Sequence, residues 1–84
     1  MDDDKILLSE MKKGSEGKIT NFLGGSKHRD KLNSLGLRTG KKIKVISNMA
    51  FNGPITVDVG YSRIAVGRGM ASKVLVKKIT KQLE

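Results

Sequence analysis

Residues 24–40 read GGSKHRDKLNSLGLRTG, and this stretch predicts one short helix with both of its ends marked. Ser26 is a natural N-cap, because its hydroxyl can accept a hydrogen bond from a backbone N–H of the first turn. Gly36 is suited to the position just past the last turn, because it adopts a left-handed conformation without a Cβ clash, and Leu37 would then pack back onto the helix. One face of the helix carries three side chains at helical spacing: His28, Leu32 and Leu35.

The rest of the chain reads as short strands separated by turn residues. We expect five of them, at residues 16–23, 41–47, 55–59, 63–66 and 73–79. Turn signals spaced about ten residues apart are typical of a small barrel. The sequence therefore predicts an all-β fold, a small β-barrel of about five strands, with one short α-helix after the first strand.

Three smaller features complete this prediction. Ser9 is expected to cap a single helical turn over residues 10–13, and a second turn is expected within residues 67–72. In the first strand the alternation is imperfect, because Ile19 and Asn21 would share one side.

The chain has 84 residues, which is the size of one domain. We expect that domain to span residues 6–79, with residues 80–84 as a tail. Residues 1–5 are expected to be a disordered acidic segment, and their sequence MDDDK resembles the remnant of an engineered protease site.

The charge is strongly positive, with 17 Lys and Arg against 8 Asp and Glu, or +9 formally. Without the three aspartates of residues 2–4 the formal charge rises to +12. Such a surface favours anionic partners: nucleic acid, an acidic protein or an anionic membrane face. The lysines could equally serve to keep a small domain soluble, since they are spread along the chain.

No motif in the sequence predicts an enzyme. The chain lacks cysteine, His28 is its one histidine, and residues 67–69 are too short to form a phosphate-binding loop. A metal site is not predicted either, because His28 and Asp30 stand two residues apart and so face different sides of a helix. The absence of cysteine and of any long apolar run makes the cytoplasm the default location.

Two kinds of binding protein remain open. A protein-docking module would use apolar loop side chains together with basic residues, and we expect the partner-binding residues to be Met49, Phe51, Lys41, Lys42, Lys44 and Arg38. A nucleic-acid-binding barrel would track phosphates with its lysines. Against it, the aromatic residues are few and form no basic–aromatic repeat: Phe22, Phe51 and Tyr61.

Several short motifs follow one another in an order that is characteristic of one family. These motifs are LSEMKKG at residues 8–14, GKI at 17–19, LGLRTG at 35–40, GPI at 53–55, IAV at 64–66 and MA at 70–71 followed by VLV at 74–76. Together they resemble the family of ferrous iron transport protein A, FeoA, from about Ile6 to Lys78. Thr39 departs from the family pattern, which usually has proline there.

The resemblance implies an SH3-like barrel in the bacterial cytoplasm, held near the inner membrane through its partner. Family members act as accessories of FeoB, the membrane protein with a cytosolic G domain that imports Fe(II). The family label also mentions transition-metal binding, and the same domain type occurs at the C-terminus of metal-dependent repressors. The function that we expect is therefore non-enzymatic docking on the cytosolic part of FeoB, with a basic nucleic-acid-binding barrel as the alternative.

Overall fold

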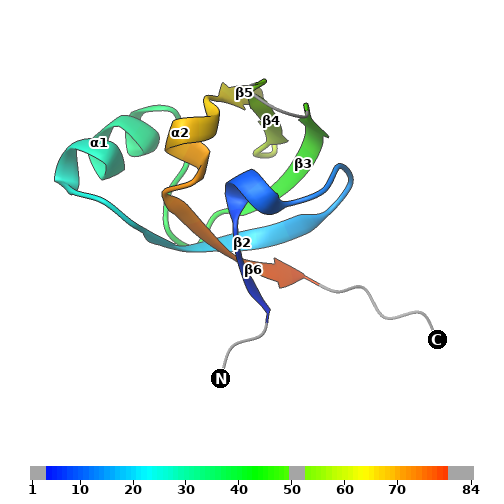
Figure 1. The fold of residues 1–84 in the computed structure, drawn as a ribbon, viewed down its shortest axis with the longest axis horizontal. Coiled ribbons are helices and arrows are strands. Elements are labelled where there is room, and N and C mark those ends of the chain that lie inside the picture. The colour runs from blue at the N-terminus through cyan, green and yellow to red at the C-terminus, as the bar shows by residue number, and fades with distance from the viewer. Residues whose placement is uncertain (1–3, 50–52, 80–84) are drawn as a thin grey trace.

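The computed structural model describes residues 4–49 and 53–79, which form one curled, antiparallel sheet with small helices around it (Figure 1). The strands are β1 Lys5–Leu7, β2 Glu16–Phe22, β3 Lys42–Asn48, β4 Ile55–Asp58, β5 Arg63–Val66 and β6 Val74–Ile79. The helices are the 3₁₀ turn η1 Leu8–Glu10, α1 Ser26–Ser34 and α2 Arg68–Ala71. The six strands lie side by side in the order β1-β6-β2-β3-β4-β5.

The sheet has one strand more than the five that the sequence predicts. The additional strand is β1, which begins at Lys5 and pairs with β6 through Ile6 opposite Val76. Just before it, the carbonyl of Asp4 accepts a hydrogen bond of 2.8 Å from the Lys78 N–H. Three residues are too few to show an alternating pattern, so β1 is recognisable only through its pairing with β6.

Helix α1 follows β2 as predicted. The prediction of its N-cap residue is wrong, whereas the prediction of its C-terminal end is confirmed. The N-cap residue is Gly25, and no side chain caps the first turn, so the prediction of Ser26 as N-cap is wrong. The C-terminal end is confirmed, because Gly36 has a φ of +98°. The Gly36 N–H donates to the Asn33 carbonyl at 3.0 Å and the Leu37 N–H to the Leu32 carbonyl at 2.9 Å, which is a Schellman motif.

The helical face that the sequence predicts is only partly buried. Leu32 is fully buried and His28 is half-buried, whereas Leu35 is 40% exposed. Leu32 and the buried Leu37 thus fix the C-terminal half of α1 to the core.

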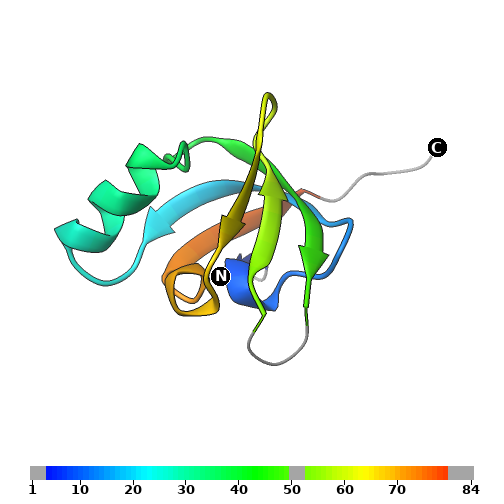
Figure 2. The same cartoon turned by 90° about the horizontal axis from the view of Figure 1, so that it is seen from above.

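The two helical turns lie next to each other at one end of the curled sheet (Figure 2). The turn α2 confirms the expectation for residues 67–72. The other turn, η1, lies earlier in the chain than the predicted 10–13, and no side chain caps it, so the role assigned to Ser9 is wrong. Leu8 and Met11 are buried, which shows that this segment closes the core.

The core fills the inside of the curl. The imperfect alternation in β2 has a structural cause, because the register between β2 and β6 shifts between Ile19 and Asn21. This bulge turns Ile19 inward and leaves Asn21 exposed. The buried side chains are Leu8, Met11, Ile19, Leu32, Leu37, Ile43, Val45, Ile55, Val57, Val59, Val66, Ala71, Val74 and Val76.

Candidate functional site

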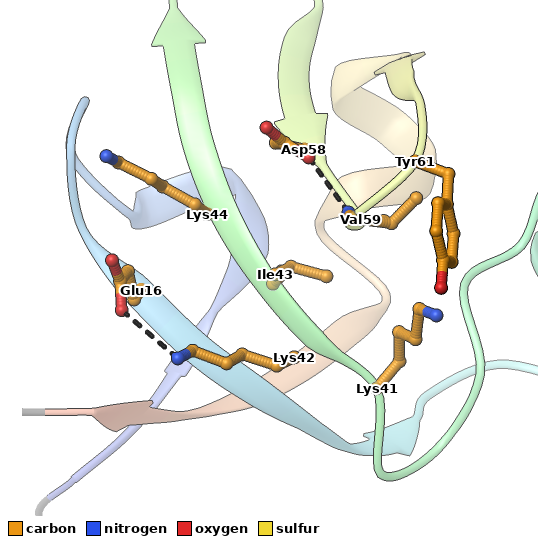
Figure 3. Close-up of a pocket in the computed structure, with 9 residues that line it drawn as sticks. Glu16, Lys41, Lys42, Ile43, Lys44, Asp58, Val59 and Tyr61 are labelled. Atoms are coloured by element: carbon orange, nitrogen blue, oxygen red, sulfur yellow. Dashed lines mark hydrogen bonds and ion pairs between the residues drawn. The ribbon is translucent and has the colours of Figure 1, made fainter.

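A pocket of about 530 Å³ opens beside the start of β3 (Figure 3). It is built by β2, by the first residues of β3 and by the β4–β5 hairpin. The residues that line it are Glu16, Lys41, Lys42, Ile43, Lys44, Asp58, Val59, Gly60 and Tyr61. We call this the β3 pocket.

Three lysines and two carboxylates set the charge around the β3 pocket. Lys42 Nζ lies 3.8 Å from Glu16 Oε1; the lysine side chain is 64% exposed and the glutamate side chain 14%. Because the lysine end of this pair is largely in solvent, which screens the attraction, the pair contributes about 1 kcal/mol or less to stability. Asp58 accepts a hydrogen bond of 2.8 Å from the Gly60 N–H and so holds the hairpin turn. Lys44 lies opposite Glu16 on one side and Asp58 on the other, and Lys41 adds a third positive charge.

Tyr61 is the most exposed large side chain at the β3 pocket, with its full surface accessible. It stands at the tip of the β4–β5 hairpin, which is closed by a 3.0 Å hydrogen bond from the Val59 N–H to the Ser62 carbonyl. In Figure 3 its ring and the Lys41 side chain point toward each other across one side of the pocket. Sequence reasoning treated Tyr61 as a turn residue, although an aromatic side chain at a hairpin tip is itself a sign of an exposed contact residue.

The predicted partner-binding residues that the structure describes are not all in one place. Lys41, Lys42 and Lys44 come together in the β3 pocket. Arg38 is exposed in the turn before β3, where its carbonyl accepts a 2.9 Å hydrogen bond from the Lys41 N–H, but it does not line the pocket.

The predicted apolar contacts lie elsewhere. Met49 is 59% exposed and directly follows the far end of β3, so roughly 17 Å of strand separates it from Lys44, the nearest β3 residue that lines the β3 pocket. Phe51 lies outside the described residues. Met49 and the three lysines thus lie on different parts of the surface, and their role in partner binding stays a prediction.

A polar cluster beneath Met49 was also missed by sequence reasoning. Arg68 on α2 donates to the Ser9 carbonyl at 3.2 Å, to Asn48 Oδ1 at 2.7 Å and to the Met49 carbonyl. Asn48 Nδ2 donates in turn to the carbonyls of Ser9 at 3.2 Å and Met11 at 2.6 Å. These bonds join α2, η1 and the end of β3, and we call this set the Arg68–Asn48 cluster.

Within residues 4–49 and 53–79, no three side chains of His, Cys, Asp or Glu are grouped as metal ligands. The half-buried His28 instead lines a shallow hollow of about 220 Å³ with Lys27, Lys31 and Met70. Two ammonium groups beside an imidazole oppose the binding of a cation.

Comparison with known proteins identifies the family. A sequence model of the FeoA domain matches residues 6–78. The chain belongs to the FeoA family. A relative from Methanocaldococcus jannaschii, named "Putative Fe(2+) transport protein A", is 37% identical over 70 residues, which cover 83% of each chain.

Solved structures agree with this family assignment. A crystal structure of an iron uptake regulatory protein, FeoA, is 43% identical, with a TM-score of 0.84 over 89% of this chain and 99% of that one. A manganese-dependent transcriptional repressor matches with a TM-score of 0.82 at 17% identity, over 89% of this chain and 42% of that one, which shows likeness of fold alone.

Membership of the FeoA family gives the chain a role in ferrous iron transport and confirms the expected SH3-like fold. Across the described part of the chain, no helix is long and apolar enough to cross a membrane.

Proposed function

We propose that the protein is a non-enzymatic accessory of ferrous iron uptake that docks on the cytosolic part of an FeoB-type membrane transporter and modulates it. Family membership supports a role in ferrous iron uptake, and the β3 pocket supports docking on a partner protein. The observation that carries the proposal is the fully exposed Tyr61 beside a lysine-rich rim. Fe(II) is the cargo of the transporter, and the accessory protein works in the cytoplasm at the inner membrane.

The β3 pocket has the composition of a protein-docking site. Tyrosine supplies a large, rigid contact area and a hydroxyl, and it is enriched among the residues that dominate binding energy. The lysines around it would meet acidic side chains of the partner and accelerate the encounter. Tyr61 is thus the anchor of the proposed interface, and Lys41 and Lys44 lie on its rim.

A binding titration against the isolated cytosolic domain of the transporter tests this proposal. We expect Tyr61→Ala to weaken binding by about tenfold or more, which is the loss of at least ~1.4 kcal/mol typical of an interface anchor. The double variant Lys41→Glu/Lys44→Glu should lower the association rate and flatten its salt dependence.

The matched control is Lys27→Glu/Lys31→Glu on α1, which changes the total charge by the same amount outside the β3 pocket. We expect this control to bind within about twofold of the wild type, since rim charges act locally at physiological salt. Equal losses in the two double variants, or no saturable binding by the wild type, would refute docking through the β3 pocket.

The alternative from the sequence, a nucleic-acid-binding barrel, is tested by adding a random oligonucleotide to the same titration. Of the aromatic side chains that the structure describes, Phe22 packs against the core and Tyr61 is exposed, which offers little surface for stacked bases. Tight, salt-sensitive binding of the oligonucleotide that displaces the transporter domain would favour the alternative.

A further inference from the structure

The register of the sheet places four lysines directly opposite one another across four neighbouring strands. Lys5 on β1 lies opposite Lys77 on β6. Lys77 also lies opposite Lys18 on β2, and Lys18 lies opposite Lys42 on β3. Residues that are directly opposite in a sheet share a face, so these side chains form one line, which we call the lysine row.

The lysine row spans about 14 Å, because neighbouring strands lie roughly 4.8 Å apart. All four residues are exposed. Lys42 faces Glu16 at 3.8 Å, whereas Lys18 and Lys77 form no ion pair with any described residue. Like charges directly opposite each other destabilise a sheet, so the folded protein carries this row at a cost in stability.

The surroundings of the lysine row are partly apolar. Side chains two positions apart on a strand point to the same face, so Leu7 lies beside Lys5, and both Leu75 and Ile79 lie beside Lys77. Leu7 and Leu75 are half-buried, and Ile79 is 36% exposed. The same face therefore offers ammonium groups and apolar side chains together.

We propose that the lysine row is a contact surface for an anionic lipid bilayer. Its ammonium groups would lie among the headgroups, with the stems of the lysines against the neighbouring leucines. Each lysine close to an anionic leaflet raises partitioning about fivefold, so the row acts as a reversible, salt-sensitive anchor.

The composition of the lysine row favours a bilayer over other anionic partners. It holds lysine without arginine or aromatic residues, whereas protein interfaces are depleted in lysine and enriched in arginine and aromatics. Single-stranded nucleic acid is held by stacking on aromatic rings, and the row presents none. An anionic bilayer can be bound by positive charge that is spread over a face. Such binding needs neither the paired N–H donors of arginine nor an aromatic ring for stacking.

This surface overlaps the proposed transporter-docking surface only at Lys42. Lys18 and Lys77 do not line the β3 pocket, and Lys42 is common to both surfaces. Substitution of Lys18 and Lys77 therefore tests membrane contact without touching the proposed docking site.

The test is flotation of the full chain with vesicles of phosphatidylcholine, with and without anionic phosphatidylglycerol. We expect the wild type to bind the anionic vesicles alone and to be released by salt. Lys18→Gln/Lys77→Gln should reduce partitioning by roughly 25-fold, about fivefold for each lysine. The matched control Lys27→Gln/Lys31→Gln, which removes the same charge from α1, should reduce it much less.

Equal reductions in the two variants would overturn the proposal, because total charge and not the row would then drive binding. It would also be overturned if the wild type ignored anionic vesicles, or if it bound a random oligonucleotide instead with the same dependence on Lys18 and Lys77. The melting temperature of Lys18→Gln/Lys77→Gln should be equal to or above that of the wild type, because three like-charged contacts are relieved: Lys5–Lys77, Lys77–Lys18 and Lys18–Lys42. A lower value would contradict the inferred cost of the row.

Discussion

Gly17 shows how one residue can decide where two strands meet. It lies in β2, opposite Lys78 on β6, and it is buried. A Cβ added at this position would overlap the Val76 side chain and stand 2.9 Å from the Lys77 carbonyl oxygen. The close approach of β2 and β6, which brings Lys18 beside Lys77, therefore depends on the absence of a side chain at Gly17.

We expect Gly17→Ala to lower the free energy of unfolding by about 1–3 kcal/mol, as overpacking of a filled site does. The matched control is Gly69→Ala in α2, where a Cβ would meet no atom within 4 Å. That control should be neutral or slightly stabilising, because alanine favours a helix over glycine. Urea unfolding followed by far-UV circular dichroism suits this chain, which has no tryptophan. Equal stability of Gly17→Ala and the wild type would show that β6 can shift enough to make room for the added Cβ.

The two ends of α1 show when a local sequence signal is sufficient. Gly36 was identified correctly because a φ of +98° is open to glycine and strained for other residues. Ser26 was misplaced by one position, because serine is compatible with both the cap and the first helical turn. A signal that depends on backbone sterics is thus more reliable than one that depends on an optional hydrogen bond.

At the scale of elements, the Arg68–Asn48 cluster joins pieces that are remote in sequence. The Asn48 side chain donates to two backbone carbonyls and accepts from Arg68, so it links the end of β3 to η1 and α2. These segments close the end of the curled sheet at which β3 ends (Figure 2). No local pattern in the sequence predicts this, because the partners are 19 to 59 residues apart.

We expect Asn48→Ala to destabilise the protein by about 1–3 kcal/mol, because it removes the two hydrogen bonds that the Asn48 amide donates and the one that it accepts from Arg68, all at a partly buried site. The control is Asn33→Ala in α1, since no described residue is hydrogen-bonded to the Asn33 side chain; its effect should stay within about 0.5 kcal/mol. Urea midpoints of the two variants provide the comparison. A loss of stability no larger than that of the control would mean that water molecules take over the hydrogen bonds of the Asn48 amide.

At the scale of the whole molecule, the two proposed surfaces have different chemistry and different positions. The β3 pocket offers a tyrosine with lysines at its rim, which suits a protein, and the lysine row offers a charged sheet face, which suits a bilayer. Tyr61 follows β4, and β4 is separated from Lys77 on β6 by β2 and β3. In these two proposals the positive charge of the chain serves two different contacts.

The two proposed surfaces together predict a gain in affinity when the protein binds the transporter and the bilayer at the same time. The transporter embedded in an anionic bilayer should bind this protein more tightly than its isolated cytosolic domain does, because the second contact becomes intramolecular. Lys18→Gln/Lys77→Gln should abolish this gain and leave the affinity for the isolated domain unchanged. Titrations of the protein with the transporter in anionic and in zwitterionic nanodiscs measure this gain in affinity. Equal affinity in the two bilayers would show that the surfaces cannot be engaged together.

Elements whose signals are local could be predicted from the amino-acid sequence. Alternating strands, the end of α1 at Gly36 and the order of the family motifs can all be read along the chain, because each depends on near neighbours. The tertiary structure alone decided the strand β1, the Arg68–Asn48 cluster and the separation of Met49 from the β3 pocket. It also decided the lysine row, since Lys5, Lys18, Lys42 and Lys77 become neighbours only through the register of four paired strands. Register is fixed by burial of the inner face, and the charges on the outer face are placed as its consequence.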